Sequence, residues 1–189
     1  MLRPLEESDL ELILHWRNAP AVRQAMYSQH KISMVEHQAW YQRKKVDASA
    51  QWFLYLDQSD VPRGVVYFTA IDAQQRSAFW GFYASPEAAL GTGVRMSLDA
   101  LNLAFGELCL SKLSAEALTT NSRSLKMHKK VGFTEEGCFR EQFFDGEKRV
   151  NVIRLGMLAG EWLSKREVLQ GRVAELDARR GILHGDRLK

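Results

Sequence analysis

The sequence is poor in cysteine and contains no long apolar run. Its two cysteines, Cys109 and Cys138, form neither a CxxC pair nor a disulfide framework, so we expect free, buried thiols in a reducing compartment. No apolar segment approaches the roughly 20 residues that a membrane-spanning helix needs. The opening "MLRPLEESDL" lacks the apolar core of a signal peptide. These absences predict a cytoplasmic protein without a membrane partner.

Neither sign of charge dominates the chain. It has 26 Lys and Arg against 23 Asp and Glu, a formal charge of +3, and the two signs are interspersed. This distribution argues against nucleic acid as a partner, although it would not repel a polyphosphate ligand. With 189 residues, 46% of them apolar and 26% charged, the chain is typical of one globular protein with a full core.

Hydrophobic periodicity predicts a mixed fold of helices and strands. Ser33 and Glu36 form a capping-box pattern at the start of the second helix. The predicted helices cover residues 7–19, 33–45, 94–108 and 121–132, and the predicted strands cover residues 2–5, 51–57, 64–72, 77–85, 112–120 and 149–158. Because three strands follow one another directly, the pattern favours an α/β (α+β) sheet and not a doubly wound one. We expect the main domain to cover residues 1–160.

The remaining residues, 161–189, are charged and helical in pattern. We expect them to form an appended surface helix with breaks at Gly171 and Gly181. No internal repeat and no second domain is evident in the sequence.

A glycine-containing loop, "LGTGV", lies between a predicted strand and a buried helix. Gly91 and Gly93 leave room for backbone N–H groups to point at one ligand, and the following helix adds its partial positive charge. Such a loop suits a diphosphate, although a turn without any ligand explains it equally well. Neither GxGxxG nor GxxxxGK[ST] is present, which excludes the usual dinucleotide fold and the P-loop.

Two further segments give this loop a context. The preceding strand, "SAFWGFYAS", contains Gly81, which is typical of a bulge or of a close approach to the backbone. Downstream lies "NSRSLKMHKKVGF", a short helix that Asn121 caps. The combination resembles the Gcn5-related N-acetyltransferase (GNAT) family over roughly residues 2–158. That resemblance implies a mostly antiparallel sheet, splayed between its fourth and fifth strands, which uses acetyl-CoA and no metal ion.

The resemblance also implies how acetyl-CoA is held. The first position of the family's loop pattern, Q/R-x-x-G-x-G/A, is Ala88 here, so the diphosphate would depend on the N–H groups of residues 91–95. A backbone N–H near Phe82 or Tyr83 would stabilise the thioester oxygen during direct transfer. The implied cofactor-binding residues are Phe82, Tyr83, Ala84, Leu90, Gly91, Thr92, Gly93, Val94, Arg95 and Asn121.

The run "WRNAPAVRQAMYS…IS…EHQAW", from Trp16 to Trp40, together with "GFYASP", resembles one branch of this family. Members of that branch acetylate the 4-amino group of a UDP-linked 4-amino-4,6-dideoxy sugar in pseudaminic acid biosynthesis, which serves flagellin glycosylation. An arginine suits the phosphates or the base, whereas methionine and aromatic side chains suit the 6-methyl group and the base. The implied acceptor residues are Arg17, Met26, Tyr27, His37, Trp40, Thr69, Phe79 and Tyr83. Core packing is the competing explanation for Met26 and Trp40.

Acid and base candidates are few. His128 stands where many family members carry a tyrosine acid, and an imidazole donates or accepts protons near neutral pH. It would otherwise only line the channel for CoA. Glu116 is the best carboxylate for a base acting through water, and Thr69 would help to order that water. Loss of the amine proton directly to solvent is the alternative.

Two other functions remain open at this level. One is an acetyltransferase for protein N-termini, of the type that modifies ribosomal proteins. The other is a non-catalytic acyl-CoA-binding domain, which the replacement of the usual tyrosine by His128 favours. The family resemblance also raises the expectation of a homodimer.

Overall fold

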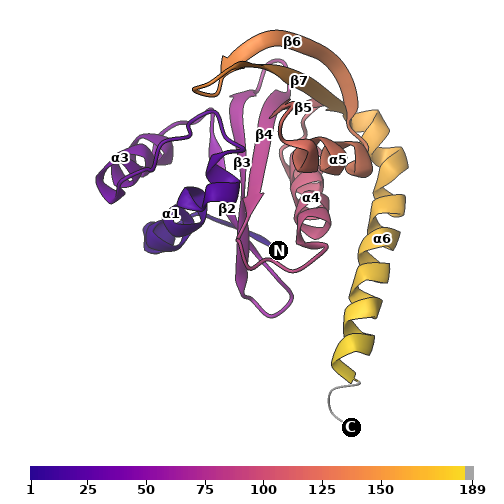
Figure 1. Ribbon diagram of the computed structural model, residues 1–189. Helices are drawn as coiled ribbons and strands as arrows, with labels where there is room; N and C mark the ends of the chain where they lie inside the picture. Colours follow the sequence, from indigo (N-terminus) through magenta and orange to yellow (C-terminus); the bar gives the residue numbers. More distant parts are fainter. Residues whose placement is uncertain (186–189) are drawn as a thin grey trace.

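The computed structural model describes residues 1–185, with side chains described for residues 1–178. Its centre is a seven-stranded sheet in the order β1-β2-β3-β4-β5-β7-β6 (Figure 1). Only β4 and β5 pair in parallel, and all other neighbours are antiparallel. The strands are β1 (Leu2–Pro4), β2 (Gln51–Leu56), β3 (Pro62–Asp72), β4 (Ser77–Ala84), β5 (Lys112–Leu118), β6 (Thr134–Phe144) and β7 (Arg149–Leu158). The predicted mixed α/β fold is confirmed.

Helices cover both faces of this sheet. The helices α1 and α3 lie on one side, whereas α4, α5 and α6 lie on the other (Figure 1). The helical segments are η1 (Glu7–Asp9), α1 (Leu10–Asn18), α2 (Pro20–Arg23), α3 (Met34–Lys45), α4 (Thr92–Asn102), the π-helical η2 (Leu103–Glu107), α5 (Ser122–Val131) and α6 (Ala159–Gly185). The capping box at the start of α3 is present, with the Ser33 N–H 2.8 Å from Glu36 Oε2. Within the described residues, no helix is long and apolar enough to cross a membrane.

The parallel pair β4–β5 separates after a short distance. Only residues 77–79 of β4 pair with residues 112–114 of β5. Beyond Phe79 and Ser114 the two strands diverge, while β4 continues along β3 to Ala84 and β5 continues along β7 to Leu118. The splay predicted between the fourth and fifth strands is therefore confirmed.

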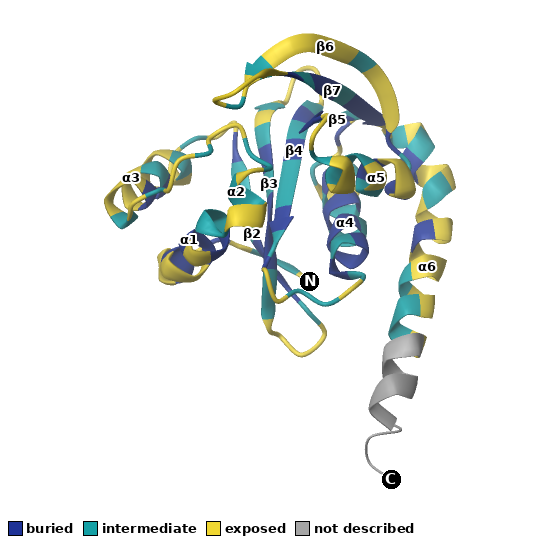
Figure 2. Ribbon diagram, viewed as in Figure 1, coloured by how far each residue is buried: buried dark blue, intermediate teal, exposed yellow. Residues whose placement is uncertain are grey.

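Strand β6 was not predicted from the sequence. Figure 2 shows that β6 is exposed almost throughout, in contrast to its neighbour β7. A strand with so little burial lacks the alternation of apolar and polar residues that reveals a half-buried strand. Its register with β7 shifts twice, between Glu135 and Gly137 and between Phe139 and Phe143.

Two expectations about local structure are wrong. Both cysteines are free but exposed, not buried: Cys109 follows η2 in a turn with φ of 50°, and Cys138 lies on β6. Helix α6 is continuous through Gly171 and Gly181. A glycine costs a helix only about 1 kcal/mol, and burial of Trp162 and Leu169 against the core offsets that cost. The last part of the predicted extension, residues 186–189, lies outside the described residues.

Gly81 allows a close approach, as its place inside a strand predicts. A Cβ atom at this position would overlap the hydroxyl and ring of Tyr67, which crosses the strand from β3. The Tyr67 ring also stacks on Trp52, with centroids 4.3 Å apart. The group that approaches Gly81 closely is thus the Tyr67 side chain. The absence of a Cβ atom at Gly81 gives this ring the room it needs.

We predict that Gly81→Ala lowers the free energy of unfolding by about 1–3 kcal/mol, because the added methyl group must displace the Tyr67 ring. Urea denaturation measures this change. The matched control is Gly137→Ala in β6, where a Cβ atom meets open space. Equal effects of the two substitutions would show that Tyr67 does not depend on Gly81.

Candidate active site

Some backbone N–H and C=O groups of β4 have no hydrogen-bond partner on β3 and point toward the splay. The Ser85 N–H donates to the Arg63 carbonyl over 2.8 Å. Hydrogen-bonded and non-hydrogen-bonded pairs alternate along an antiparallel ladder, so Tyr83 and Gly81 also bond to β3. The N–H and C=O of Phe82 and Ala84 consequently point toward the gap beside β5. Of the two N–H groups that the sequence left open, the geometry selects Phe82.

The glycine loop offers two free amides at the start of α4. Gly91 is the N-cap residue and has φ of 89°, a left-handed conformation that favours glycine. The N–H groups of Thr92, Val94 and Arg95 donate to carbonyls of the loop itself, over 3.1, 3.0 and 3.2 Å. The N–H groups of Gly91 and Gly93 have no protein acceptor among the described residues. Two amides at a helix N-terminus fit one diphosphate.

The side chains of this loop contribute less than its backbone. Leu90 is 93% exposed, whereas Thr92 and Val94 are buried. The buried guanidinium of Arg95 is already bound by Asp177 of α6, with Arg95 Nε 2.7 Å from Asp177 Oδ1. Of the five consecutive residues predicted to hold the diphosphate, the two glycines have unengaged backbone N–H groups, and Arg95 has a buried Nη1 without a partner among the described residues.

His128 lies in α5 behind the splay and is almost fully buried. Its ring packs against Trp80, Phe82 and Phe133, with centroids 5.5, 5.7 and 5.1 Å away. Nδ1 lies 2.9 Å from the Ser124 carbonyl, which can only accept, so Nδ1 carries the proton. Nε2 is buried without a partner among the described residues. Burial lowers the pKa of His128, which leaves a neutral ring whose free Nε2 accepts a hydrogen bond.

Asn121 occupies the N-cap of α5, as predicted. Its Oδ1 accepts the Ser124 N–H over 3.0 Å, and the Asn121 N–H donates to the Leu118 carbonyl at the end of β5. This cap fixes the start of α5 directly after the diverging strand. It thereby sets the position of the His128 ring, about two turns further along the helix.

A three-residue network crosses the opposite face of the splay. The Tyr27 hydroxyl donates to Glu116 Oε2 over 2.7 Å, and Arg154 donates to Glu116 Oε1 through Nη2 over 2.7 Å. Burial, followed by the contact with Glu116, raises the pKa of Tyr27, so the phenol keeps its proton. The Arg154 guanidinium also lies over the Phe79 ring, 4.5 Å from its centroid. Tyr27, Glu116 and Phe79 are thus brought together, as the sequence predicted.

Arg154 is the residue of this network that sequence reasoning missed. It lies on β7 directly opposite Glu116 of β5. A charged residue inside the apolar strand "RVNVIRLGML" was the available signal, because such a residue needs a partner. Without the register between β5 and β7 that partner was not evident.

An aromatic row extends from α3 to β3. His37 stacks on Trp40 with centroids 5.0 Å apart, and Trp40 meets the edge of Trp52 at 4.6 Å. Trp52 then stacks on Tyr67. Met26 and Trp40 are partly buried against the same cluster. Both residues therefore pack against the core and still retain exposed surface.

Cationic groups with free donors lie beside this row. Arg17 Nη2 donates to the Ser28 carbonyl over 2.7 Å, but Arg17 Nη1, Arg23 Nε and His37 Nε2 are buried without partners among the described residues. Burial lowers the pKa of Arg17, and Arg23 lowers it further; burial and then the Arg17 charge lower that of His37. Arginine nevertheless stays charged. A buried cation with unused donors is suited to an anionic ligand.

The remaining predicted acceptor residues line the floor of this face. Thr69 pairs with Phe79 across β3 and β4 where the splay begins. Tyr83 is buried, and burial raises the pKa of its phenol, with Arg17 acting in the opposite direction. Thr69 and Tyr83 are positioned by the sheet, on the face that Arg17 and Tyr27 cover.

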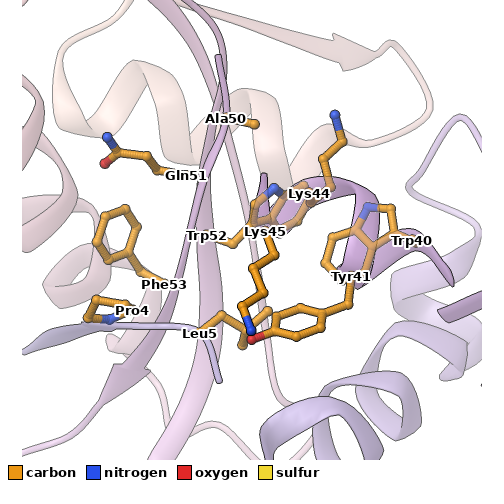
Figure 3. A pocket seen from close by; sticks show the side chains of 10 residues that line it. All are labelled: Pro4, Leu5, Trp40, Tyr41, Lys44, Lys45, Ala50, Gln51, Trp52 and Phe53. Carbon is orange, nitrogen blue, oxygen red and sulfur yellow. The ribbon is translucent and has the colours of Figure 1, made fainter. Parts of the chain in front are cut away.

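A cavity of about 280 Å³ lies elsewhere, at the outer edge of the sheet. Figure 3 shows that its lining side chains come from α3 on one side and from β1, β2 and the residues beside them on the other. Trp40 and Trp52 form part of its wall. Because it is remote from β4, β5 and the glycine loop, this cavity is separate from the splay.

A splayed β4–β5 pair beside a glycine loop is the arrangement of a known enzyme class. A family model described as an acetyltransferase (GNAT) domain matches residues 1–134. The chain belongs to the GNAT acetyltransferases, which transfer an acetyl group from acetyl-CoA to an amine.

Relatives within the family differ in what they acetylate. The chain is 29% identical to acetyltransferase PseH of Campylobacter jejuni over 130 residues, which are 69% of this chain and 80% of PseH. It is 27% identical to the spermidine N(1)-acetyltransferase of Vibrio cholerae over 168 residues, 88% of this chain and 96% of that enzyme. A crystal structure of the V. cholerae enzyme in complex with CoA and spermine aligns with a TM-score of 0.81 at 26% identity, covering 86% of this chain and 97% of that one.

We predict that the free energy of unfolding falls as the pH is lowered from about 7 to 5. Folding lowers the pKa values of His37 and His128 below their unfolded value of about 6.5. The unfolded chain therefore binds more protons than the folded chain between about pH 7 and 5. Each histidine contributes a slope of at most about 1.4 kcal/mol per pH unit. The pKa values of Asp9 and Asp57 are also lowered, but protonation of these carboxyl groups reduces the free energy of unfolding only below about pH 4.

Urea denaturation at several pH values measures this slope. His128→Phe should reduce the slope, because the buried ring can no longer be protonated. The matched control His15→Gln removes an exposed imidazole and should retain the original slope. A slope that is unchanged in His128→Phe would contradict the assignment of a buried, neutral His128.

Proposed function

We propose that this enzyme acetylates the 4-amino group of a UDP-linked 4-amino-4,6-dideoxy sugar, the reaction of pseudaminic acid biosynthesis that precedes flagellin glycosylation. The observation that carries the proposal is the set of unpartnered cationic donors on the acceptor side, Arg17 Nη1 and Arg23 Nε, beside His37 Nε2. A sugar nucleotide brings a diphosphate, which can accept hydrogen bonds from both guanidinium groups.

The same charges disfavour a polyamine. Spermidine is a polycation, and it would meet Arg17 and Arg23 before reaching the splay. The carboxylate on this face, Glu116, is already neutralised by Arg154 at 2.7 Å. Like charges in a partly buried site repel strongly because little solvent screens them. The charge pattern therefore supports an anionic acceptor, although the spermidine acetyltransferases align with more of the chain than PseH does.

Soft and flat apolar surfaces complete the acceptor side. Met26 and the exposed part of Trp40 offer contacts for a 6-methyl group and for a stacked uracil ring. Phe79 and Tyr83 line the floor at the splay, where the sugar would place its amine. An open peptide groove would not need two unpartnered guanidinium groups, so a protein N-terminus is the weaker candidate.

Transfer itself rests on backbone groups of this chain. Acetyl-CoA supplies an activated acetyl thioester. The Gly91 and Gly93 amides would hold the diphosphate of its CoA part. The Phe82 N–H, directed into the gap, would donate to the thioester oxygen and stabilise the negative charge that develops there. Alignment of the two substrates across the splay supplies much of the remaining acceleration.

Proton transfer involves His128 and Glu116. The free Nε2 of neutral His128 accepts a hydrogen bond or a proton, so an acid role requires that the ring be protonated first. Glu116 Oε2 would give up its hydrogen bond from the Tyr27 hydroxyl and accept one from the sugar amine or from a water molecule. Oε1 would keep its hydrogen bond from Arg154. Thr69 would help to order that water. A cytoplasmic location and a homodimer remain predictions.

A turnover screen tests the acceptor class. Acetyl-CoA is incubated with the UDP-linked 4-amino sugar, with spermidine or with a peptide amine, and thiol release is measured together with the mass of the product. We expect release only with the UDP-sugar. Acetylation of spermidine or peptide but not of the sugar would overturn the proposal. Binding of acetyl-CoA without release for any amine would favour a non-catalytic domain.

We predict that Arg17→Ala raises KM for the UDP-sugar on the order of tenfold, because one charge-assisted contact to phosphate is lost. KM for acetyl-CoA should stay the same, since Arg17 lies on the acceptor face. Steady-state kinetics with each substrate varied separately measure both values. Arg43→Ala, which removes an exposed arginine of α3, is the control. An unchanged KM for the sugar in Arg17→Ala would contradict the role of Arg17.

A further inference from the structure

The C-terminal helix α6 lies against the glycine loop. A Cβ atom at Gly91 would come within 3.0 Å of the Leu176 side chain. The neighbouring residue, Asp177, lies 2.6 Å from Arg95 Nη2 and accepts the Gln58 Nε2–H over 3.0 Å. The family model ends at residue 134, so this helix lies outside it. The contact between α6 and the glycine loop therefore lies beyond the part of the chain that the family model matches.

A second cavity, of about 480 Å³, lies between α5 and α6. It is lined by Lys129, Lys130, Arg172, Glu175 and Leu176. Three of these residues are cationic and one is anionic. Because Leu176 contacts Gly91 and also lines the cavity, the cavity adjoins the loop that would hold the diphosphate.

The cations of this cavity are fixed, but they retain free donors. Arg172 Nη1 donates to the Lys130 carbonyl over 2.7 Å, which anchors the guanidinium at the end of α5. Lys129 is 3.3 Å from Glu135, and Lys130 has no ion pair among the described side chains. A guanidinium with one nitrogen anchored still presents the remaining N–H groups to an anion.

We propose that Arg172, together with Lys129 and Lys130, binds the 3′-phosphate of CoA, so that α6 completes the nucleotide end of the acetyl-CoA site. The inference rests on the proposed placement of the diphosphate at Gly91 and Gly93. In CoA the adenosine lies on the opposite side of the diphosphate from the pantetheine arm, and this basic cavity adjoins the glycine loop at Leu176. A phosphate dianion matches an arginine fork flanked by two lysines.

Asp177 has a separate part in this arrangement. Its carboxylate pairs with Nε and Nη2 of Arg95, whereas Nη1 of Arg95 lies beside Gly91 without a partner among the described residues. The pair fastens α6 to the first turn of α4 and holds Arg172 at the rim of the cavity. The cationic side chains proposed for the 3′-phosphate thus come from α5 and α6.

Calorimetric titration with CoA and with 3′-dephospho-CoA tests this subsite. The wild-type protein should bind CoA on the order of tenfold more tightly than dephospho-CoA, and Arg172→Ala should remove most of that ratio. Arg166→Ala, on an exposed part of the same helix, is the matched control and should retain it. Glu175→Gln should raise the ratio, because it removes the one negative charge of the cavity. Circular dichroism confirms that each variant is folded.

The outcomes separate the subsite from the proposed function. If Arg172→Ala binds CoA normally and keeps the wild-type ratio of affinities for CoA and dephospho-CoA, the proposed subsite is wrong. The proposed acetyl-CoA site would be unaffected by that result. A wild-type protein that binds both nucleotides equally would also overturn it. Failure to bind either nucleotide would contradict the diphosphate site and the subsite together.

Discussion

Two parallel strands that stop pairing leave backbone N–H and C=O groups without partners inside the protein, and this constraint shapes the rest of the molecule. Beyond Phe79 and Ser114, β4 is bonded on one side only. Buried backbone groups are almost always paired, so a gap of this kind is maintained only if something else can fill it. An amide-rich arm that mimics a strand is such a partner. The unpaired groups of the splay therefore support our proposal that acetyl-CoA binds there.

The two faces of the sheet differ in character. On the face of α4, α5 and α6, apolar packing surrounds His128, and the half-buried Gly91 and Gly93 have the amides that we propose for the CoA diphosphate. On the face of α1 and α3 lie partly exposed aromatic rings and the unpartnered donors of Arg17 and Arg23, which support the proposed anionic acceptor. The network of Tyr27, Glu116 and Arg154 links this face to strands β5 and β7. Under the proposed function, the amine and the thioester meet at the gap between β4 and β5.

Much of the fold was predictable because its signals are local. Alternation in β2 to β4, the capping box at Ser33 and the glycines of the loop are all set by neighbouring residues. Strand β6 was not predicted, because its exposed surface gives no alternation. The continuity of α6 through Gly171 was missed because packing of Trp162 and Leu169 outweighs the glycine.

The sequence named candidate site residues, but the contacts between them could not be predicted from it. Tyr27 and Glu116 are 89 residues apart, and only the folded chain shows that they share a hydrogen bond. The roles of Arg154 and Asp177 depend on strand register and on helix docking, which sequence spacing does not encode. The tautomer of His128 likewise follows from one carbonyl, that of Ser124.

Amide chemical shifts recorded by NMR during titration with acetyl-CoA test the central claim most directly. The account predicts that the amide protons of Phe82, Gly91 and Gly93 move downfield together and saturate with one dissociation constant. Movement of other amides while these three stay unchanged would show that the gap and the glycine loop do not hold acetyl-CoA.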